Sequence, residues 1–500
     1  MSLNLLPVPS FRQVVMGVFF VAITLLDPFG LSSSSDAASE RWLNRMFASG
    51  YGHLGQQQIA VVLIDDAYLQ RNGTFWPMPY DEQSKLFKNL LSFKPKAVFA
   101  DLLYSHDHAD GQAGKDSQLL ANVFERYQRR GIPFFLANSG VAQKEAGHVN
   151  ALESLSSASS PALVQWSGFD ERYPLAVSTS MGNLETPALA LYREYCRDRL
   201  CADIPADTAS AVTAPPMAVQ WGLNMPPEQS SVARADDCRA IGGLAEEFWK
   251  QLMHAVFWKL DDSDDKPVCR YALTLTATDL EVTDEQDREL IGRLIANRLV
   301  LVGANITSAS DLTESPVNGL VPGVFLHAMA LDNLITQGMK YDRDPESVRG
   351  TNFNWLDVLS IFLVGVIALI RCLHQRASED FEACDRLTRV RVGLLSPLAS
   401  WIVVLGFLWL LSQVLNATHI TPVNVLGVLL ISLVLVADAF SSLPKIFAPF
   451  NPKKRNLNVQ ADCVCYRFVV QPGLCCGCQY GRSLSGGSCF CARRAGQGSA

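Results

Sequence analysis

Four apolar segments constrain this chain of 500 residues more than any other feature of its sequence. They cover residues 14–26, 353–370, 394–415 and 423–443. The last three approach the ~20 residues that cross a hydrocarbon core ~30 Å thick, whereas the first is short enough to be an anchor or the core of a signal peptide. We therefore expect a membrane protein with four transmembrane helices.

The distribution of charge indicates how these helices are oriented. Between Asp27 and Asn354 there are 42 acidic and 28 basic residues, whereas the rest of the chain has 14 basic and 7 acidic residues. Loops rich in Arg and Lys stay in the cytoplasm. This rule places residues 1–13, the Arg-rich loop 371–393 and the segment 444–500 inside, and it places residues 27–352 and the short turn 416–422 outside.

The large outer block alternates between strand-like and helix-like patterns. Continuous apolar runs at residues 59–64, 97–104, 132–137 and 298–303 predict strands that are covered on both faces. Amphipathic patterns predict helices at 81–91, capped by Asp81, at 116–130 and at 324–338. This alternation is typical of an α/β fold, with a mostly parallel sheet flanked by helices. Residues 196–287 are polar and rich in Pro, and they are interpreted as an insertion with a small helix near 244–260.

Three acidic residues follow the predicted strands directly. Asp65 and Asp66 end the first strand, and Asp101 lies in the second. Because the carboxyl ends of parallel strands form the rim where crevices open, these side chains are candidate ligand-binding residues. The alternative is that they only cap the next helix or turn.

Three further residues are candidates for the same rim. The prolines of WPMP fix an extended turn that would lay the Trp76 ring over the end of the sheet, as a lid or as structural packing. Asp311 lies in the loop 303–323. Its side chain is expected either to face the crevice or to form a hydrogen bond within the loop. His327 lies early in a predicted helix. It either binds a ligand or is a core histidine whose hydrogen bonds are made within the protein.

Metal and disulfide chemistry have weaker signals. His106, Asp107 and His108 lie close together in SHDHAD, which is a metal-binding group or a solvated loop. In the Cys-rich final segment, Cys475 and Cys478 have the spacing of a zinc-binding pair, although a disordered tail is the other interpretation. No particular cofactor is indicated. The outer block contains four cysteines that are either reduced or paired in disulfides: Cys196, Cys201, Cys238 and Cys269.

Four motifs occur in order along the outer block: VVLIDDAYL, FWPMPY, KAVFADLLYS and RLVLVGANITSASDLTESPVNGLVPGVFLHAMALDNLI. Together they resemble the CHASE family of extracellular sensory domains, type 2, over about residues 45 to 340. Met78 and Tyr80 depart from the family's WPWPR-like turn. The resemblance implies a receptor of the bacterial inner membrane with its large domain in the periplasm, and receptors with this outer domain often work as homodimers.

The sequence contains no GxSxG, GxxxxGK[ST] or HExxH motif and no kinase or cyclase signature, so we expect no enzyme. Relatives carry a catalytic output domain after the last helix, but only some 57 residues follow Leu443 here. We therefore expect a receptor for a periplasmic small molecule or protein that signals to a separate cytoplasmic or membrane partner. The alternative is a membrane scaffold that docks another envelope protein. The acidic outer block is not expected to bind nucleic acid, and the apolar helices contact lipid.

Overall fold

The computed structural model describes residues 31–104, 115–141, 152–167, 172–232, 238, 269–308, 311–346, 354–379, 387, 390–421 and 425–441. The chain forms two compact units. The first comprises residues 1–367 and 402–433, and the second comprises residues 368–401 and 434–500. The outer domain, with its sheet and its candidate site, belongs to the first unit.

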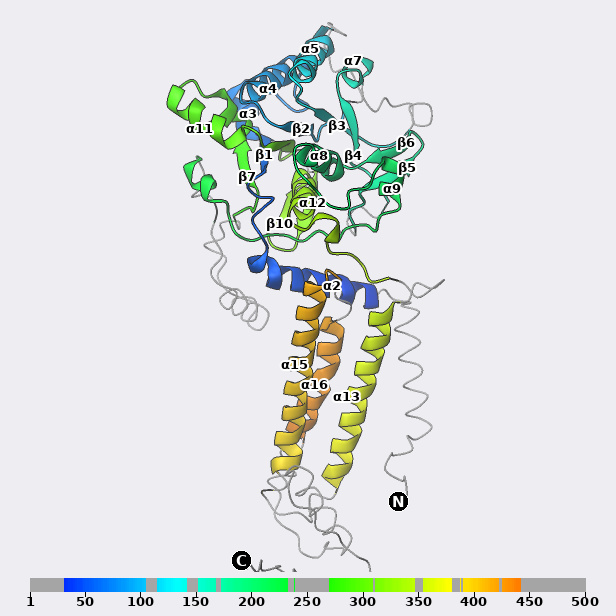
Figure 1. Ribbon diagram of the computed structural model, residues 1–500. Coiled ribbons are helices and arrows are strands. Elements are labelled where there is room, and N and C mark those ends of the chain that lie inside the picture. Colours follow the sequence, from blue (N-terminus) through cyan, green and yellow to red (C-terminus); the bar gives the residue numbers. More distant parts are fainter. Residues whose placement is uncertain are drawn as a thin grey trace, which may run out of the picture. The chain divides into compact units, whose positions relative to one another are not determined.

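A six-stranded parallel sheet forms the centre of the outer domain, as predicted (Figure 1). The strand order is β4-β3-β2-β8-β1-β7, and every neighbouring pair is parallel. The late strand β8 therefore lies between β1 and β2, at the centre of the sheet. The strands are β1 (Ile59–Asp65), β2 (Ala97–Ala100), β3 (Phe134–Asn138), β4 (Ser160–Leu163), β7 (Leu273–Thr276) and β8 (Leu299–Asn305).

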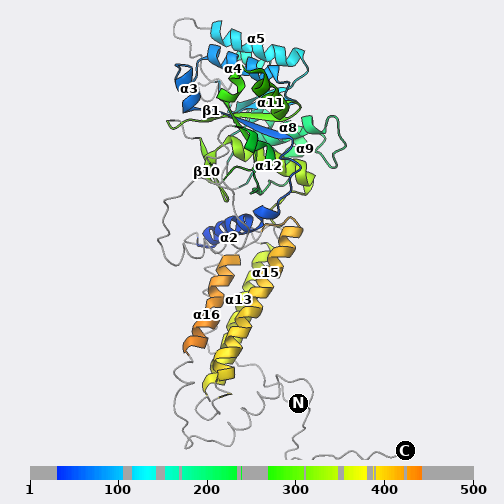
Figure 2. The ribbon, with the colours of Figure 1, turned by 90° about the vertical axis from the view of Figure 1, so that its left-hand side faces the viewer.

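Helices cover both faces of this sheet, which is why its central strands are apolar throughout. Ala60, Val62 and Ile64 pack with helices on one face, while Val61 and Leu63 pack with helices on the other. Figure 2 shows the two layers on opposite sides of the sheet. The first layer contains α3 (Asp66–Arg71), α4 (Tyr80–Ser92), α5 (Lys115–Arg129) and α11 (Glu285–Ile295), and the second contains α8 (Pro187–Cys196) and α12 (Val324–Gln337).

Smaller elements decorate this framework. Two antiparallel hairpins are formed by β5 (Ala176–Thr179) with β6 (Gly182–Glu185) and by β9 (Leu312–Ser315) with β10 (Gly319–Pro322). Three further helices are α2 (Leu31–Phe47), α7 (Glu153–Ser156) and α9 (Thr208–Val212). Short 3-10 turns occupy Ala48–Gly50, Pro227–Ser231, Ala277–Glu281 and Gly338–Lys340.

The predicted elements differ from the structure mainly at their ends. Helix α4 begins at Tyr80 with Pro79 at its N-cap, so Asp81 lies in the first helical turn and does not cap the helix. Strand β2 ends at Ala100, four residues earlier than predicted. Helix α12 ends before Gly338, as predicted. The small helix expected near 244–260 lies outside the described residues.

Three helices follow the outer domain: α13 (Trp355–Glu379), α15 (Ser396–Ala417) and α16 (Val425–Ser441), with a π-helical turn at Arg391–Leu395. Within the described residues, two stretches are long and apolar enough to cross a membrane, Trp355–His374 and Gly393–Ala417. Of the four predicted transmembrane helices, the described residues therefore support the second and the third as candidate membrane spans. Helix α16 carries only a shorter apolar stretch, Gly427–Ala437, and the predicted segment 14–26 lies outside the described residues.

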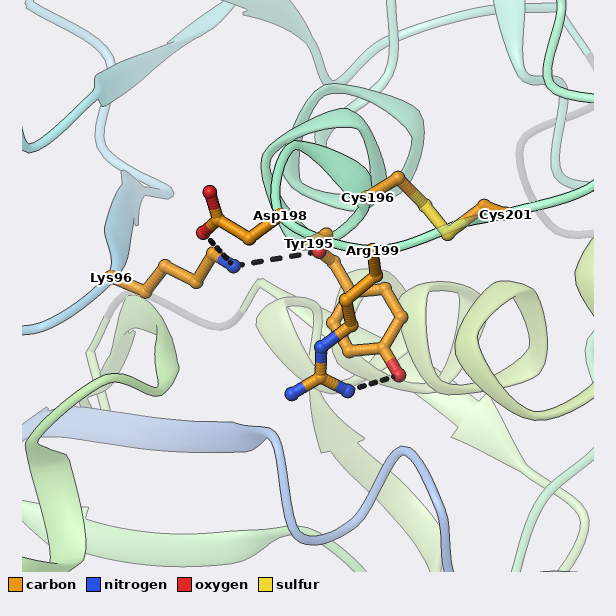
Figure 3. Close-up of a disulfide and its surroundings, with 6 residues drawn as sticks. All are labelled: Lys96, Tyr195, Cys196, Asp198, Arg199 and Cys201. Atoms are coloured by element: carbon orange, nitrogen blue, oxygen red, sulfur yellow. Dashed lines mark hydrogen bonds and ion pairs between the residues drawn. A yellow bond between two sulfur atoms is a disulfide. The ribbon is translucent and has the colours of Figure 1, made fainter.

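The four cysteines of the outer block form two disulfides, Cys196–Cys201 and Cys238–Cys269. The first follows helix α8 directly (Figure 3). Beside it, Lys96 Nζ lies 3.1 Å from Asp198 Oδ2, and the guanidinium of Arg199 lies 4.3 Å from the centre of the Tyr195 ring. The disulfide thus fixes the end of α8 next to the residue that precedes β2.

Candidate ligand-binding site

A cavity of about 740 Å³ opens at the carboxyl ends of β2, β4 and β8. In parallel sheets this edge is where ligands bind, and the volume is in the range of small-molecule sites. Its walls come from six parts of the chain: the segment before and at the start of α4, the residues after β2, the residues after β4, the end of β8, Asp311, and the first turn of α12 with the glycine before it. The residues lining it are Trp76, Pro77, Met78, Tyr80, Gln83, Asp101, Leu102, Leu103, Tyr104, Val164, Gln165, Trp166, Ala304, Asp311, Gly323 and His327.

Asp101 follows β2 directly and lines this cavity. Its backbone N–H donates to the carbonyl of Val302 at 2.8 Å, which continues the pairing of β2 with β8 and fixes the position of the side chain. The carboxyl group has no hydrogen bond from the described residues. Burial raises the pKa of Asp101 to about 8, and the negative charge of Asp311 contributes in the same direction. The group is therefore mostly protonated at neutral pH.

Asp311 stands at the outer rim and approaches the backbone before α12. The N–H of Gly323 donates to the carbonyl of Asp311 at 2.8 Å. A Cβ atom at position 323 would lie 2.7 Å from Asp311 Oδ2, so a residue larger than Gly would displace this carboxylate. Asp311 is an exposed residue, and partial desolvation of its carboxylate raises its pKa.

His327 is 2% exposed and lies on the cavity wall. The hydroxyl of Tyr173 accepts a hydrogen bond from the N–H of Ala188 at 3.3 Å and lies 2.8 Å from His327 Nδ1. The tautomer of His327 decides which of the two groups donates in this bond. Burial lowers the pKa of His327 to about 3, so the ring is neutral. Nε2 has no partner among the described residues.

Aromatic rings form much of the remaining wall, and their polar atoms are bonded to protein groups. The hydroxyl of Tyr104 donates to Gln83 Oε1 at 2.7 Å, and Gln83 Nε2 donates to the carbonyl of Met78 at 2.7 Å. The indole N–H of Trp166 donates to the carbonyl of Arg172 at 3.0 Å. These bonds hold the rings in place and leave their carbon surfaces to face the cavity.

The structure brings four of the six predicted ligand-binding residues together in this cavity: Trp76, Asp101, Asp311 and His327. The other two lie outside it. Asp65 caps α3 by accepting from the N–H of Tyr68 at 2.8 Å, and the exposed Asp66 accepts from the hydroxyl of Thr307 at 2.6 Å.

Sequence reasoning did not identify Trp166 or Tyr104 as residues of this site. Trp166 follows β4, a strand that was not predicted from the sequence. The signal for this strand was the apolar run ALVQW, which comes after the polar run SSASS. Tyr104 was assigned to a strand that in fact ends at Ala100, so its place in the cavity wall was hidden by the strand boundary.

The metal candidates His106, Asp107, His108, Cys475 and Cys478 all lie outside the described residues. Within the part of the chain that the structure describes, no three His, Cys, Asp or Glu side chains are placed to hold a metal ion. Asp101, Asp311 and His327 line one cavity but do not form such a group.

A backbone ladder leads from the cavity wall to the turn after α15. Tyr173, whose hydroxyl holds His327, exchanges two backbone hydrogen bonds with Met217, at 2.9 and 2.7 Å. Met217 pairs with Arg343, and Arg343 pairs with Ile420. The Arg343 N–H donates to the carbonyl of His419 at 3.2 Å, and the Thr421 N–H donates to the carbonyl of Arg343 at 3.0 Å.

Charged side chains strengthen this junction, which we define as residues 342–344 together with 419–421. Asp342 Oδ1 lies 2.8 Å from His419 Nδ1, and Asp344 Oδ1 accepts from the hydroxyl of Thr421 at 2.8 Å. Arg172 binds Asp344 at 2.6 Å and also binds Glu40 of α2 at 3.0 Å. A second cavity, of about 480 Å³, lies between α2 and these residues.

A parallel α/β sheet with a cavity at its carboxyl edge, lined by two acidic residues and several aromatic rings, has the geometry of a small-molecule site. The chain belongs to the CHASE2 domain family, whose family model matches residues 15–370. CHASE2 is a family of extracellular sensory domains. Searches of curated proteins and of solved structures found no match.

Proposed function

We propose that this protein is a multi-pass sensory receptor of the bacterial inner membrane, whose periplasmic domain detects a small molecule in the cavity around Asp101. Binding changes the junction between the domain and the helices, and the change reaches a separate signalling partner. In this proposal the chain has no catalytic activity of its own.

The observation that supports this proposal best is the continuity between cavity and junction. His327 lines the cavity, and its ring is bonded to Tyr173. Tyr173 begins the ladder that ends at Ile420, in the turn after α15. A ligand that moves the His327 ring therefore acts on a hydrogen-bonded path that reaches a helix long enough to cross a membrane.

The partner is expected on the cytoplasmic side. The Arg-rich loop 371–393 and the Cys-rich segment 444–500 are the two candidate docking regions, and both follow from the charge distribution in the sequence. The chain is expected to form homodimers, as receptors with this domain often do. Lipid is expected to surround the apolar helices.

Crosslinking in native membranes, followed by affinity purification and mass spectrometry, tests the proposal. A cyclase, a kinase or a response regulator that co-purifies with the chain would support a split receptor. If only structural proteins of the envelope co-purify, or none at all, the scaffold function is favoured. In a chain that signals, deletion of residues 453–500 distinguishes the two docking regions, because unchanged signalling would leave the Arg-rich loop as the docking site.

A further inference from the structure

The cavity around Asp101 contains unbalanced acidic groups. Two carboxyl groups line it, those of Asp101 and Asp311, and no Lys or Arg is among its described lining residues. His327 cannot supply the missing charge, because burial lowers its pKa to about 3 and keeps the ring neutral. A buried charge without a partner is unfavourable, so Asp101 holds a proton when the cavity contains only water.

The polar atoms that remain available in the cavity suit a positively charged ligand. The Tyr104 hydroxyl and the Trp166 indole N–H are bonded to Gln83 and to the carbonyl of Arg172. The two carboxyl groups and His327 Nε2 remain available to a ligand, together with the neutral side chains of Gln165 and Trp76. An anion would find no Lys or Arg among the described lining residues, whereas a cation would replace the proton of Asp101 and pair with both acids.

The walls of the cavity favour an organic cation over a metal ion. Within the described residues, no group of three potential metal ligands comes together, although hard cations take six or more oxygen ligands. Four aromatic residues line the cavity instead: Trp76, Tyr80, Tyr104 and Trp166. Aromatic ring faces attract ammonium groups and also cover the carbon atoms attached to them.

We propose that this cavity binds a small organic cation, whose ammonium group pairs with Asp101 and Asp311 while its carbon atoms pack against Trp76 and Trp166. The inference rests on the proposed sensory function and specifies the ligand class. Ligand and proton compete for Asp101, so binding releases one proton at neutral pH. The affinity rises up to about tenfold per pH unit as the pH approaches 8, the pKa of Asp101 in the empty cavity.

The other titratable groups around Asp101 do not cancel this pH dependence. His327, on α12, stays neutral above its pKa of about 3. Tyr104, after β2, stays protonated because burial raises its pKa well above the usual value. Asp311 ionises as the pH rises, which favours a cation in the same direction as Asp101.

The test uses the full chain in detergent and a panel of probes in matched pairs. Choline is paired with dimethylbutanol, its neutral carbon isostere, and alkylamines and diamines are paired with the corresponding alcohols and carboxylates. Thermal stabilisation identifies binders. Calorimetry in two buffers of different ionisation enthalpy then counts the protons released. At least one ammonium probe is expected to bind more tightly than its neutral partner and to release close to one proton at pH 7.

Two variants locate the effect. D101N keeps the shape of the side chain and removes its charge, and it is expected to weaken the ammonium probe by about 30-fold or more. D66N is the matched control, because Asp66 lies near the same sheet edge but is bonded to Thr307 outside the cavity. Its affinity for the probe is expected to stay unchanged. Circular dichroism of both variants shows that they are folded.

Preferential binding of neutral or carboxylate probes that D101N weakens would overturn the organic-cation inference and leave small-molecule sensing by this cavity intact. Ammonium binding that survives D101N would also overturn the inference, because the ammonium group would then not pair with Asp101. The inference also fails if no ammonium probe binds at millimolar concentration. If no probe of any charge binds, small-molecule sensing by this cavity is also rejected.

Discussion

The environment of Asp101 makes this residue a source of instability as well as a candidate ligand-binding group. Its position is fixed by the pairing of β2 with β8, and its carboxyl group lies among aromatic rings with only another acid nearby. An acid in such a place favours its protonated form in the folded chain, whereas in the unfolded chain it ionises near pH 4.

This difference predicts how stability depends on pH. Below about pH 4 Asp101 is protonated in both states, and its burial costs little. Between pH 4 and its folded-state pKa of about 8, only the unfolded state loses the proton, so the free energy of unfolding falls as pH rises. For one proton the slope is at most about 1.4 kcal/mol per pH unit.

We therefore expect D101N to be close to the wild type in stability near pH 4 and more stable than it near pH 8. Urea unfolding of the two proteins across this range measures the difference. D66N serves again as the control, since Asp66 is exposed and its bonds to Thr307 lower its pKa. A constant difference between D101N and the wild type at all pH values would contradict the buried-acid interpretation.

At the scale of the elements, the strands that sequence reasoning placed most closely are those with buried apolar residues on both faces. Strands β1 and β8 were predicted to within two residues, because a run of Val, Leu and Ile has no polar face to confuse the assignment. Strand β4, Ser160–Leu163, was missed because its first two residues are exposed and polar or Pro. With β4 missing, Trp166 was missing from the site too.

The strand order also had to come from the structure. Sequence order suggests that β1 and β2 are neighbours, but β8 pairs with both and separates them. Nothing in the local sequence encodes this pairing. It is nevertheless what brings Ala304 and the segment leading to Asp311 and His327 beside Asp101.

The close contact between β8 and α12 requires a glycine at position 303. A Cβ atom on Gly303 would lie 2.6 Å from Val324 Cβ, and Val324 is 1% exposed. G303A therefore forces β8 and α12 apart, and we expect a loss of about 1–3 kcal/mol in the free energy of unfolding. Chemical denaturation of the full chain measures this loss.

G292A is the matched control for that change. Gly292 lies within helix α11, and the nearest atom to its added Cβ would be Phe93 Cδ1 at 3.7 Å, an ordinary contact. Because Ala favours helices over Gly by up to about 1 kcal/mol, this variant is expected to be as stable as the wild type or more stable. If both variants lost stability equally, the close approach of β8 and α12 would not be the cause.

The Cys196–Cys201 disulfide has a local role at the end of α8. It closes a short loop, for which the chain-entropy argument gives about 2 kcal/mol. The double variant C196S/C201S is expected to lose stability on that order and to exchange amide hydrogens faster at residues 197–204. Faster exchange throughout the sheet, instead of in this segment, would show that the disulfide supports the whole domain.

For the whole molecule, the decisive question is whether the cavity and the helices respond together. The ladder from Tyr173 to Ile420 is made of backbone bonds, and Arg172 strengthens it by binding Asp344 and Glu40 at the same time. The Arg172 and Glu40 side chains are 25% and 24% exposed, so this ion pair is less screened by solvent than one at the surface. Arg172 contacts the cavity lining through its backbone carbonyl, which accepts from Trp166, so removing the side-chain charge weakens the junction and leaves that bond in place.

We expect R172Q to bind a cavity ligand with unchanged affinity and to lose the response of the junction to that ligand. In the wild type, ligand binding should change amide hydrogen exchange at residues 342–344 and 416–421, and in R172Q the change at 416–421 should disappear.

R41Q is the control, because Arg41 also joins α2 to the outer domain, through Glu314, but both side chains are about half exposed or more. The control should respond like the wild type, since exposed ion pairs contribute little. An R172Q protein whose turn still responds fully would show that the signal reaches the helices by another route, and the segment between residue 346 and α13 would then be the place to look.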